Sequence, residues 1–212
     1  MLYMAERSMP GPNFLELLLS GCPMRLNIPN TLTWARIILI PLFVGVFYLP
    51  ESWLLSSEKN LIACLIFVVA AATDWFDGYL ARRLGQTSAF GAFLDPVADK
   101  LMVSAALVML VKLGRVDALV ALIIIGREIT ISALREWMAQ IGAAKSVAVS
   151  FIGKLKTTAQ MIAIPVLLYF DPILGVSPQP IGTVLLWAAA ILTLWSMFYY
   201  LQRAWPYLRE SI

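Results

Sequence analysis

The sequence predicts an all-α, polytopic membrane protein with six transmembrane helices and an N-terminal amphipathic interfacial segment before the first of them. Its composition is the first reason: 60% of the 212 residues are hydrophobic, 14% are charged, and the mean hydropathy is +0.81. Soluble domains carry about 25% charged residues. The second reason is that long apolar segments recur along the chain, with Gly or Pro residues between them.

Six segments are long and apolar enough to cross a bilayer, which takes about 20 residues of helix. Only the last of them, residues 181–202, is free of charged residues. The other five carry charges, mostly near one end, and cover residues 32–48, 60–82, 89–113, 116–140 and 156–170. Breaks fall at Pro50, Gly85, Gly114, Gly142 and the Pro- and Gly-rich stretch 171–182.

The basic residues predict the orientation of these helices. With Met1 on the cytoplasmic side, all but three of the 16 Lys and Arg residues fall in inner loops or inner halves of helices. The exceptions are Lys59, Lys112 and Arg115. Because positive charge favours the cytoplasmic side, we expect both termini to be cytoplasmic. Residues 25–34 then form the amphipathic segment on the inner surface.

Aromatic residues are concentrated in the last segment. We interpret them as interfacial anchors and lipid-packing residues rather than as ligand-binding groups. They are Trp187, Trp195, Phe198, Tyr199 and Tyr200.

The composition also excludes several kinds of chemistry. The chain has no histidine, which rules out a histidine general base, a Ser-His-Asp triad and a histidine-ligated zinc site. Cys22 and Cys64 are too few for a disulfide framework or a thiolate metal site. A net charge of +3 is too small to favour nucleic acid as a partner. Proton chemistry therefore has to use carboxylates or lysines.

Four of the six aspartates lie within the sequence DWFDGYLARRLGQTSAFGAFLDPVAD, as Asp74, Asp77, Asp95 and Asp99. Residues three or four apart share one face of a helix, and the break at Gly85 folds two helices antiparallel, so both pairs converge. Four carboxylates in a membrane need compensating charge. Oxygen ligands suit Mg²⁺, Mn²⁺ or Ca²⁺, and two such ions commonly assist phosphoryl transfer. The alternative is a structural pairing with Arg82, Arg83 and Lys100.

These aspartates belong to the longer pattern D-x2-D-G-x2-A-R-x8-G-x3-D-x3-D, which includes Gly78, Ala81, Arg82 and Gly91. In this pattern the chain resembles the CDP-alcohol phosphatidyltransferases. The resemblance implies one transmembrane domain over residues 24–205, an N-terminal extension over 1–23 and a cytoplasmic tail over 206–212. It also implies a homodimer in a bacterial inner membrane, with the active site on the cytoplasmic side.

The resemblance further implies a role for each residue. Two Mg²⁺ or Mn²⁺ ions are held by Asp74, Asp77, Asp95 and Asp99, and Asp99 also acts as the general base. The lipid substrate CDP-diacylglycerol is contacted by Asp74, Gly78, Arg82 and Thr33. Residues 127–139 and 146–161 are most similar to bacterial family members that use sn-glycerol 3-phosphate. The implied reaction transfers the phosphatidyl group to this acceptor and releases CMP.

Basic residues beyond the pattern predict a pocket for the acceptor's phosphate. Arg127 and Glu128 lie near the middle of the fourth predicted helix, where a charge costs at least about 2.5 kcal/mol on insertion scales. Arg135, Lys154 and Lys156 lie further inward and would bind the phosphate together with Arg127. The role of Glu128 is open, with Arg135 or the neighbours of Arg127 as its candidate partners. Alternatively, these cations only reflect the positive-inside bias.

Three other functions compete with this hypothesis. The same aspartates serve family members that use another acceptor, such as inositol phosphate or serine. Acidic pairs inside a membrane also occur in divalent-cation transporters, although Arg82 and the absence of a sequence repeat count against transport. A scaffold without catalysis is the third alternative, and it predicts that Asp99→Asn leaves cellular function intact.

Overall fold

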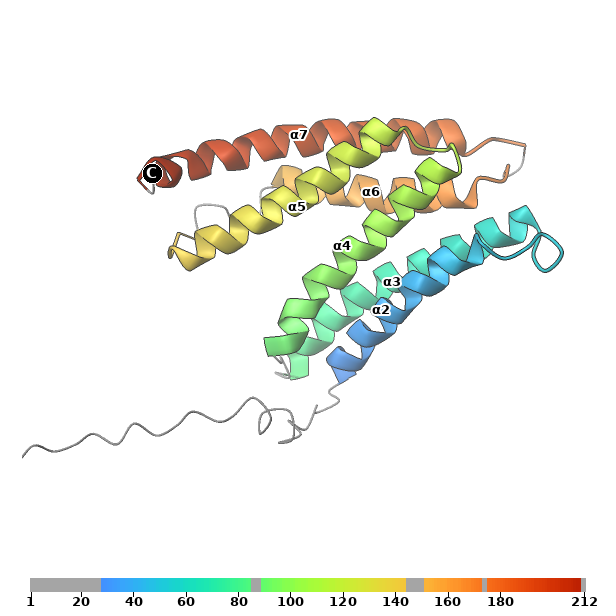
Figure 1. The fold of residues 1–212 in the computed structure, drawn as a ribbon, viewed down its shortest axis with the longest axis horizontal. Coiled ribbons are helices and arrows are strands. Elements are labelled where there is room, and N and C mark those ends of the chain that lie inside the picture. Colours follow the sequence, from blue (N-terminus) through green and yellow to red (C-terminus); the bar gives the residue numbers. More distant parts are fainter. Residues whose placement is uncertain (1–27, 85–88, 144–150, 173–174, 211–212) are drawn as a thin grey trace, which may run out of the picture.

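The structure, a computed structural model, describes residues 28–84, 89–143, 151–172 and 175–210. Within these residues the chain forms six α-helices (Figure 1). They are α2 (Ile28–Val46), α3 (Ser56–Leu84), α4 (Ala89–Lys112), α5 (Ala118–Gln140), α6 (Phe151–Tyr169) and α7 (Gln179–Glu210). The predicted all-α fold is confirmed, and each helix overlaps one predicted segment.

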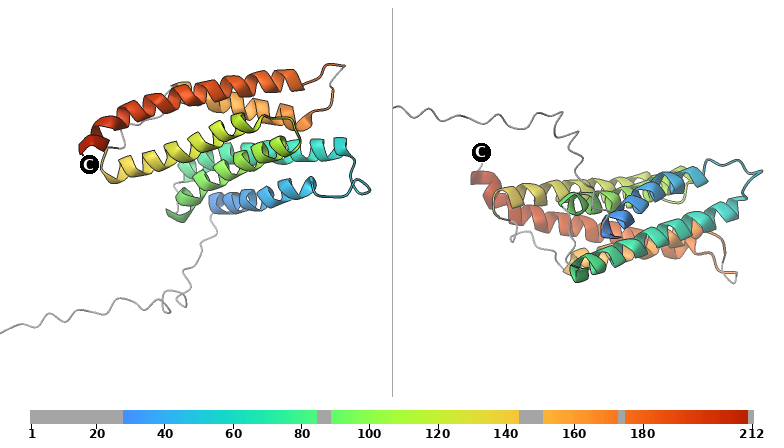
Figure 2. Two further views of the ribbon diagram at one scale, coloured as in Figure 1. Left: turned by 45° about the horizontal axis from the view of Figure 1, so that its top comes forward. Right: turned by 90° about the horizontal axis from the view of Figure 1, so that it is seen from below.

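Successive helices run in opposite directions and lie along one another as a bundle (Figure 2). α2 packs against α3 and α4, α6 packs against α3 and α7, and α5 packs mainly against α7. The start of α2 and the end of α7 lie at the same end of the bundle, which we call the inner end. The opposite, outer end carries the connections 47–55, 113–117 and 170–178.

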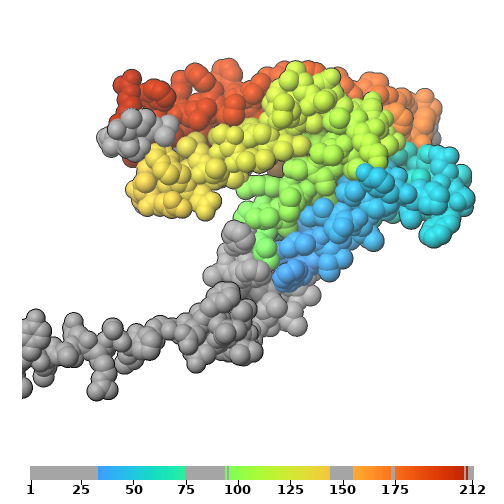
Figure 3. Space-filling view, viewed as in Figure 1, coloured from blue at the N-terminus to red at the C-terminus, as the bar shows by residue number. Residues whose placement is uncertain are grey.

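α4 and α5 are joined by a short connection at the outer end and diverge toward the inner end (Figure 1). Gly114 permits this connection because its backbone has a φ of 67°, a conformation that other residues adopt only at a cost. Asp117 caps α5, since its side chain accepts a hydrogen bond from the backbone N–H of Leu119 at 2.8 Å. The divergence leaves a hollow between the two helices (Figure 3).

The side chain of Arg115 holds the outer end together. Its guanidinium donates hydrogen bonds to the backbone carbonyls of Leu167 and Leu168 at 3.1 and 2.8 Å, and to Oδ1 of Asn60 at 2.6 Å. It also lies over the ring of Phe170, 4.1 Å from the centroid. A cation is favourable at the C-terminus of a helix, here that of α6. Arg115 thus ties the α4–α5 connection to both α3 and α6.

Large apolar side chains are exposed on all six helices, including Ile38, Leu65, Leu101, Leu122, Ile162 and Ile191. Such a surface is unfavourable in water and suits a lipid environment. Within the described residues, two helical stretches are long and apolar enough to cross a membrane, Ser56–Asp74 and Gln179–Tyr207. The apolar stretches of α2 and α6, Thr33–Val46 and Leu155–Tyr169, are shorter. Charged residues interrupt α4 in its inner half, and α5 from its middle toward its inner end.

Two predicted segments are helical where the structure describes them. Of the predicted interfacial segment 25–34, residues 28–34 belong to α2, and Thr33 is buried within the bundle. The predicted tail over 206–212 is helical as far as Glu210, and α7 continues through Pro206. Within this stretch, Tyr207 packs against the apolar cluster that Tyr200 and Ala204 form with Ile131 and Met138 of α5. Residues 25–27 and the predicted extension over 1–23 lie outside the described residues.

Gly182 provides a test of the packing between α6 and α7. A Cβ atom at this position would lie 2.6 Å from Cγ of Leu167, which is closer than two non-bonded carbon atoms can approach. We predict that Gly182→Ala destabilises the protein by about 1–3 kcal/mol, the usual cost of overpacking. Its thermal unfolding midpoint in detergent, followed by tryptophan fluorescence, should fall by several degrees.

Gly45→Ala is the matched control for this substitution. A Cβ atom on Gly45, in α2, would meet no atom within 4 Å, and alanine favours a helix over glycine. The midpoint of this variant should stay the same or rise. Equal midpoints for the two variants would contradict the close contact between α6 and α7.

Candidate active site

The four aspartates of the sequence pattern lie on α3 and α4, toward the inner end of the bundle. Asp74 and Asp77 belong to the last three turns of α3, and Asp95 and Asp99 to the first three turns of α4. The two helices are antiparallel neighbours. The structure describes the side chains of Asp74 and Asp99. The surroundings of four other predicted site residues lie outside the described part of the chain: Asp77, Gly78, Arg82 and Asp95.

Asp74 forms an ion pair with Arg36 of α2. Nη1 of Arg36 donates to Oδ1 of Asp74 at 2.7 Å. The arginine side chain is 1% exposed, whereas that of Asp74 is 44% exposed. A buried guanidinium needs a charged partner, and Asp74 supplies it while one side of its carboxylate stays accessible. The predicted lipid-binding residue Thr33 is buried one turn before Arg36 on the same helix.

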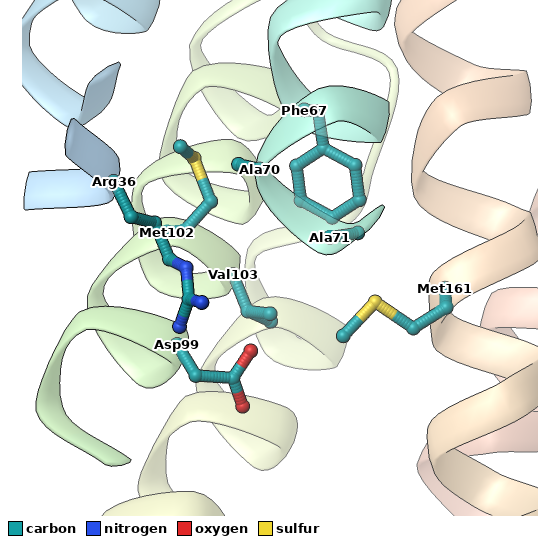
Figure 4. Close-up of a pocket in the computed structure, with 8 residues that line it drawn as sticks. All are labelled: Arg36, Phe67, Ala70, Ala71, Asp99, Met102, Val103 and Met161. Atoms are coloured by element: carbon teal, nitrogen blue, oxygen red, sulfur yellow. The ribbon is translucent and has the colours of Figure 1, made fainter. Parts of the chain in front are cut away.

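Asp99 lies beside the same arginine. The carboxylate of Asp99 and the guanidinium of Arg36 border a small cavity of about 10 Å³, whose other walls are largely apolar (Figure 4). Asp99 interacts electrostatically with Arg36 and Asp74, and also with Glu128 of α5. A space of this size holds at most about one water molecule. The small cavity therefore cannot admit a substrate.

A larger cavity of about 460 Å³ lies between α4 and α5, where the two helices diverge. Its volume is within the range of about 300–1,000 Å³ that is usual for small-molecule sites. The lining residues are Pro96, Val97, Asp99 and Lys100 from α4, and Arg127, Glu128, Ile131, Ser132, Arg135 and Glu136 from α5. The structure thus brings the predicted base to the same cavity as two of the predicted phosphate-binding arginines.

Contacts with α7 hold both arginines in place. Nη2 of Arg127 donates to Oγ of Ser196 at 3.0 Å, and Nη2 of Arg135 donates to the hydroxyl of Tyr200 at 3.2 Å. Oγ of Ser196 in turn donates to the backbone carbonyl of Thr193 at 2.9 Å. Since α5 also packs against α7 through buried apolar residues, the two guanidinium groups are fixed relative to the bundle.

Glu128 connects Arg127 to Lys156, which the sequence predicts for the phosphate pocket but which is not among the residues that line the cavity. Its Oε1 accepts hydrogen bonds from Nζ of Lys156 on α6 and from Nη1 of Arg127, the latter at 3.4 Å. The sequence could not assign a partner to Glu128, and Arg135 was one candidate. No ion pair joins Glu128 to Arg135 in the part of the chain that the structure describes. The side chain of Lys154 lies outside that part.

Tyr200 departs from its predicted role. The sequence places it among the interfacial anchors, but its side chain is fully buried and its hydroxyl contacts Arg135. The prediction was wrong because the helical period turns Tyr200 toward α5, while its neighbours face outward. Trp195 and Phe198 are 68% and 65% exposed and agree with the prediction.

Arg36 is a residue of the site to which the sequence assigns no role. The family resemblance includes it together with Thr33, and it lies one turn after Thr33 on a buried face of α2. A basic residue inside an otherwise apolar helix was the available signal.

The described residues contain only part of the predicted metal centre. Among them, no group of three or more carboxylate, thiol or imidazole side chains could hold a metal ion. Of the predicted ligands, Asp74 and Asp99 have described side chains, and they lie near each other on adjacent helices.

Comparison with known sequences decides the family. The sequence profile described as CDP-alcohol phosphatidyltransferase matches residues 26–195. The chain belongs to the CDP-alcohol phosphatidyltransferase family. The match runs from the start of α2 into α7 and includes all four aspartates of the pattern.

Several bacterial members of the CDP-alcohol phosphatidyltransferase family are similar along most of the chain. A protein of Yersinia enterocolitica is 54% identical over 189 residues, which cover 88% of this chain and 100% of that protein. One of Sodalis glossinidius is 55% identical over 185 residues, covering 85% and 96%. One of Escherichia coli K12 is 54% identical over 183 residues, with the same coverage. All three are named CDP-diacylglycerol–glycerol-3-phosphate 3-phosphatidyltransferase.

Proposed function

We propose that the protein transfers the phosphatidyl group of CDP-diacylglycerol to sn-glycerol 3-phosphate, giving phosphatidylglycerophosphate and CMP in phospholipid biosynthesis. The observation that carries this proposal is the cavity between α4 and α5, where Asp99 lies together with Arg127 and Arg135. A carboxylate that can accept a proton and cations that can bind a phosphate are what this acceptor requires. The names of the relatives support the same reaction.

The aspartates fit a centre for two Mg²⁺ or Mn²⁺ ions. Asp74 is partly exposed beside Arg36, and the family pattern adds Asp77, Asp95 and Asp99. All four offer only oxygen ligands, which these hard cations prefer. When bound, the ions would neutralise the diphosphate of the lipid and disperse the charge of the transition state. On the donor side, Thr33, Gly78, Arg82 and Asp74 would contact the cytidine diphosphate.

The chain's own groups provide the acid–base chemistry. Asp99 accepts the proton of the attacking hydroxyl of glycerol 3-phosphate, and the hydroxyl oxygen bonds to the phosphorus that carries diacylglycerol. The bond from that phosphorus to the bridging oxygen of CMP breaks, and CMP leaves. Arg127, Arg135, Lys154 and Lys156 hold the acceptor's phosphate, which orients its free hydroxyl toward Asp99.

The reaction needs a particular placement in the membrane. We infer that all six helices cross a bacterial inner membrane, with both termini and the active site on the cytoplasmic side and residues 24–205 as one domain. Exposed apolar side chains on every helix support this placement, as do the bacterial relatives. Each helix has at least 19 residues, about 28 Å at 1.5 Å per residue, which approaches the thickness of the hydrocarbon core. A homodimer is part of the same proposal.

CMP release by the purified protein tests the proposed function. With CDP-diacylglycerol in detergent micelles and Mg²⁺ present, we predict release that depends on glycerol 3-phosphate and is abolished by a chelator. Inositol phosphate and serine should not replace the acceptor. Release with one of these alone would keep the aspartate chemistry and discard the phosphate pocket. Absence of release with every acceptor, together with metal flux into sealed vesicles, would favour a transporter instead.

A further inference from the structure

The position of Glu128 is unexpected in a pocket that binds an anion. Its carboxylate lines the cavity between α4 and α5, where it would repel the phosphate of the acceptor. We propose that Glu128 is a positioning residue, which holds Lys156 and Arg127 in the arrangement that binds this phosphate. The inference rests on the proposed function, and it assigns the role that the sequence left open.

The contacts of Glu128 carry the first step of the argument. A single atom, Oε1, accepts from both Nζ of Lys156 and Nη1 of Arg127. Lys156 and Arg127 are 1% and 7% exposed. In the described residues Lys156 has no other ion-pair partner, and a buried ammonium without one is strongly unfavourable. Glu128 therefore determines the direction in which the lysine side chain points.

The arrangement of the helices carries the second step. α5 and α6 each pack against α7, but their described residues do not pack directly against each other. The pair between Glu128 and Lys156 is thus a side-chain bridge across the space between these two helices. Arg127 and Arg135 have additional partners on α7, whereas Lys156 depends on the bridge for its place beside them.

Electrostatic repulsion carries the third step. Lys156 lies within electrostatic range of both Arg127 and Arg135. Three cations gathered within the bundle repel one another when no phosphate is bound, and one carboxylate among them offsets part of this repulsion. Because Glu128 reaches Lys156 and Arg127 through one oxygen, it draws their charged groups toward a common point.

The test compares Glu128→Gln with Glu136→Gln. Glutamine at position 128 keeps the shape of the side chain but removes the charge that holds the two cations. Glu136 lines the same cavity, two turns further along α5, and forms no ion pair among the described residues. Its replacement therefore removes the same charge from the same cavity without releasing a cation. KM and kcat are measured for both substrates, with CMP release as the assay.

For Glu128→Gln we expect KM for glycerol 3-phosphate to rise at least tenfold, while KM for CDP-diacylglycerol stays within twofold. For Glu136→Gln, KM for glycerol 3-phosphate should stay the same or fall, because a repulsive charge has gone. The substitutions Glu128→Gln and Lys156→Met should also be non-additive in KM for glycerol 3-phosphate, since each disrupts the same bridge. A merely structural role would lower stability without this selective effect on one KM.

Other outcomes would overturn the inference. A KM for glycerol 3-phosphate that is unchanged or lower in Glu128→Gln would mean that the carboxylate does not position the cations. If that variant does not fold, Glu128→Asp tests the proposal instead. Aspartate keeps the negative charge, but its side chain is one methylene shorter, so the carboxylate lies further from Lys156 and Arg127. The KM of this variant should rise at least threefold, and an unchanged value overturns the proposal. CMP release by the wild-type protein that does not depend on glycerol 3-phosphate would refute the proposed function itself.

Discussion

Asp99→Asn is expected to lower the rate of CMP release by about 10³-fold, within the range of 10²–10⁴ that is typical for loss of a general base. Asparagine keeps the size of the side chain and its place at the cavity between α4 and α5. It cannot accept the proton of the attacking hydroxyl. The rate is measured with saturating CDP-diacylglycerol and glycerol 3-phosphate, and binding of CDP-diacylglycerol should be partly retained.

The matched control for this prediction is Asp117→Asn at the outer end of the bundle. Asp117 caps α5, and asparagine is an equally good capping residue. We expect its activity to stay within twofold of the wild type. If Asp99→Asn kept more than a tenth of the activity, Asp99 would not be the base.

Arg36→Met is expected to destabilise the protein far more without divalent cations than with them. The substitution leaves Asp74 without its ion-pair partner and removes positive charge from beside Asp99. Breaking a fully buried pair costs about 3–5 kcal/mol. Asp74 is 44% exposed, so solvent screening reduces the expected loss to about 2 kcal/mol. Mg²⁺ or Mn²⁺ should restore most of this loss by supplying the missing charge.

Thermal unfolding in EDTA and in excess Mg²⁺ measures this difference. Arg115→Met is the control, because Arg115 is a partly buried arginine at the other end of the bundle, where it contacts α6 and Asn60. That variant should be destabilised to the same extent in both solutions. If Arg36→Met lowered the thermal stability equally in both solutions, Arg36 would stabilise the fold without compensating the negative charge of the aspartates.

Local sequence signals predicted much of the fold. Gly114 and Gly142 mark the ends of α4 and α5, where both adopt a positive φ. The predicted fifth segment begins at Lys156, with Lys154 and Lys156 expected to open the helix, whereas α6 begins at Phe151. Charged residues can form the first turns of a membrane helix when other helices provide their partners. Lys156 does so through Glu128 on α5.

Contacts between distant parts of the chain were beyond the reach of the sequence. The spacing of Asp74 and Asp99 predicted that they belong to one site, since both lie near the break between α3 and α4. The partner of Asp74 comes from α2, 38 residues away, and that of Glu128 from α6, 28 residues away. Contacts across such separations leave no periodic pattern in the sequence. Only the packing of the helices determines which charges meet.

The contrast between the two ends of the bundle has a consequence for the membrane as a whole. Arg115 ties the outer end together, whereas the cavity lies toward the inner end. In the proposed orientation, donor and product therefore share one monolayer. Each turnover changes a head group without moving the acyl chains to the opposite monolayer. With this placement the enzyme would supply anionic lipid to one face only, and a charge difference between the two faces would persist until lipids cross the bilayer elsewhere.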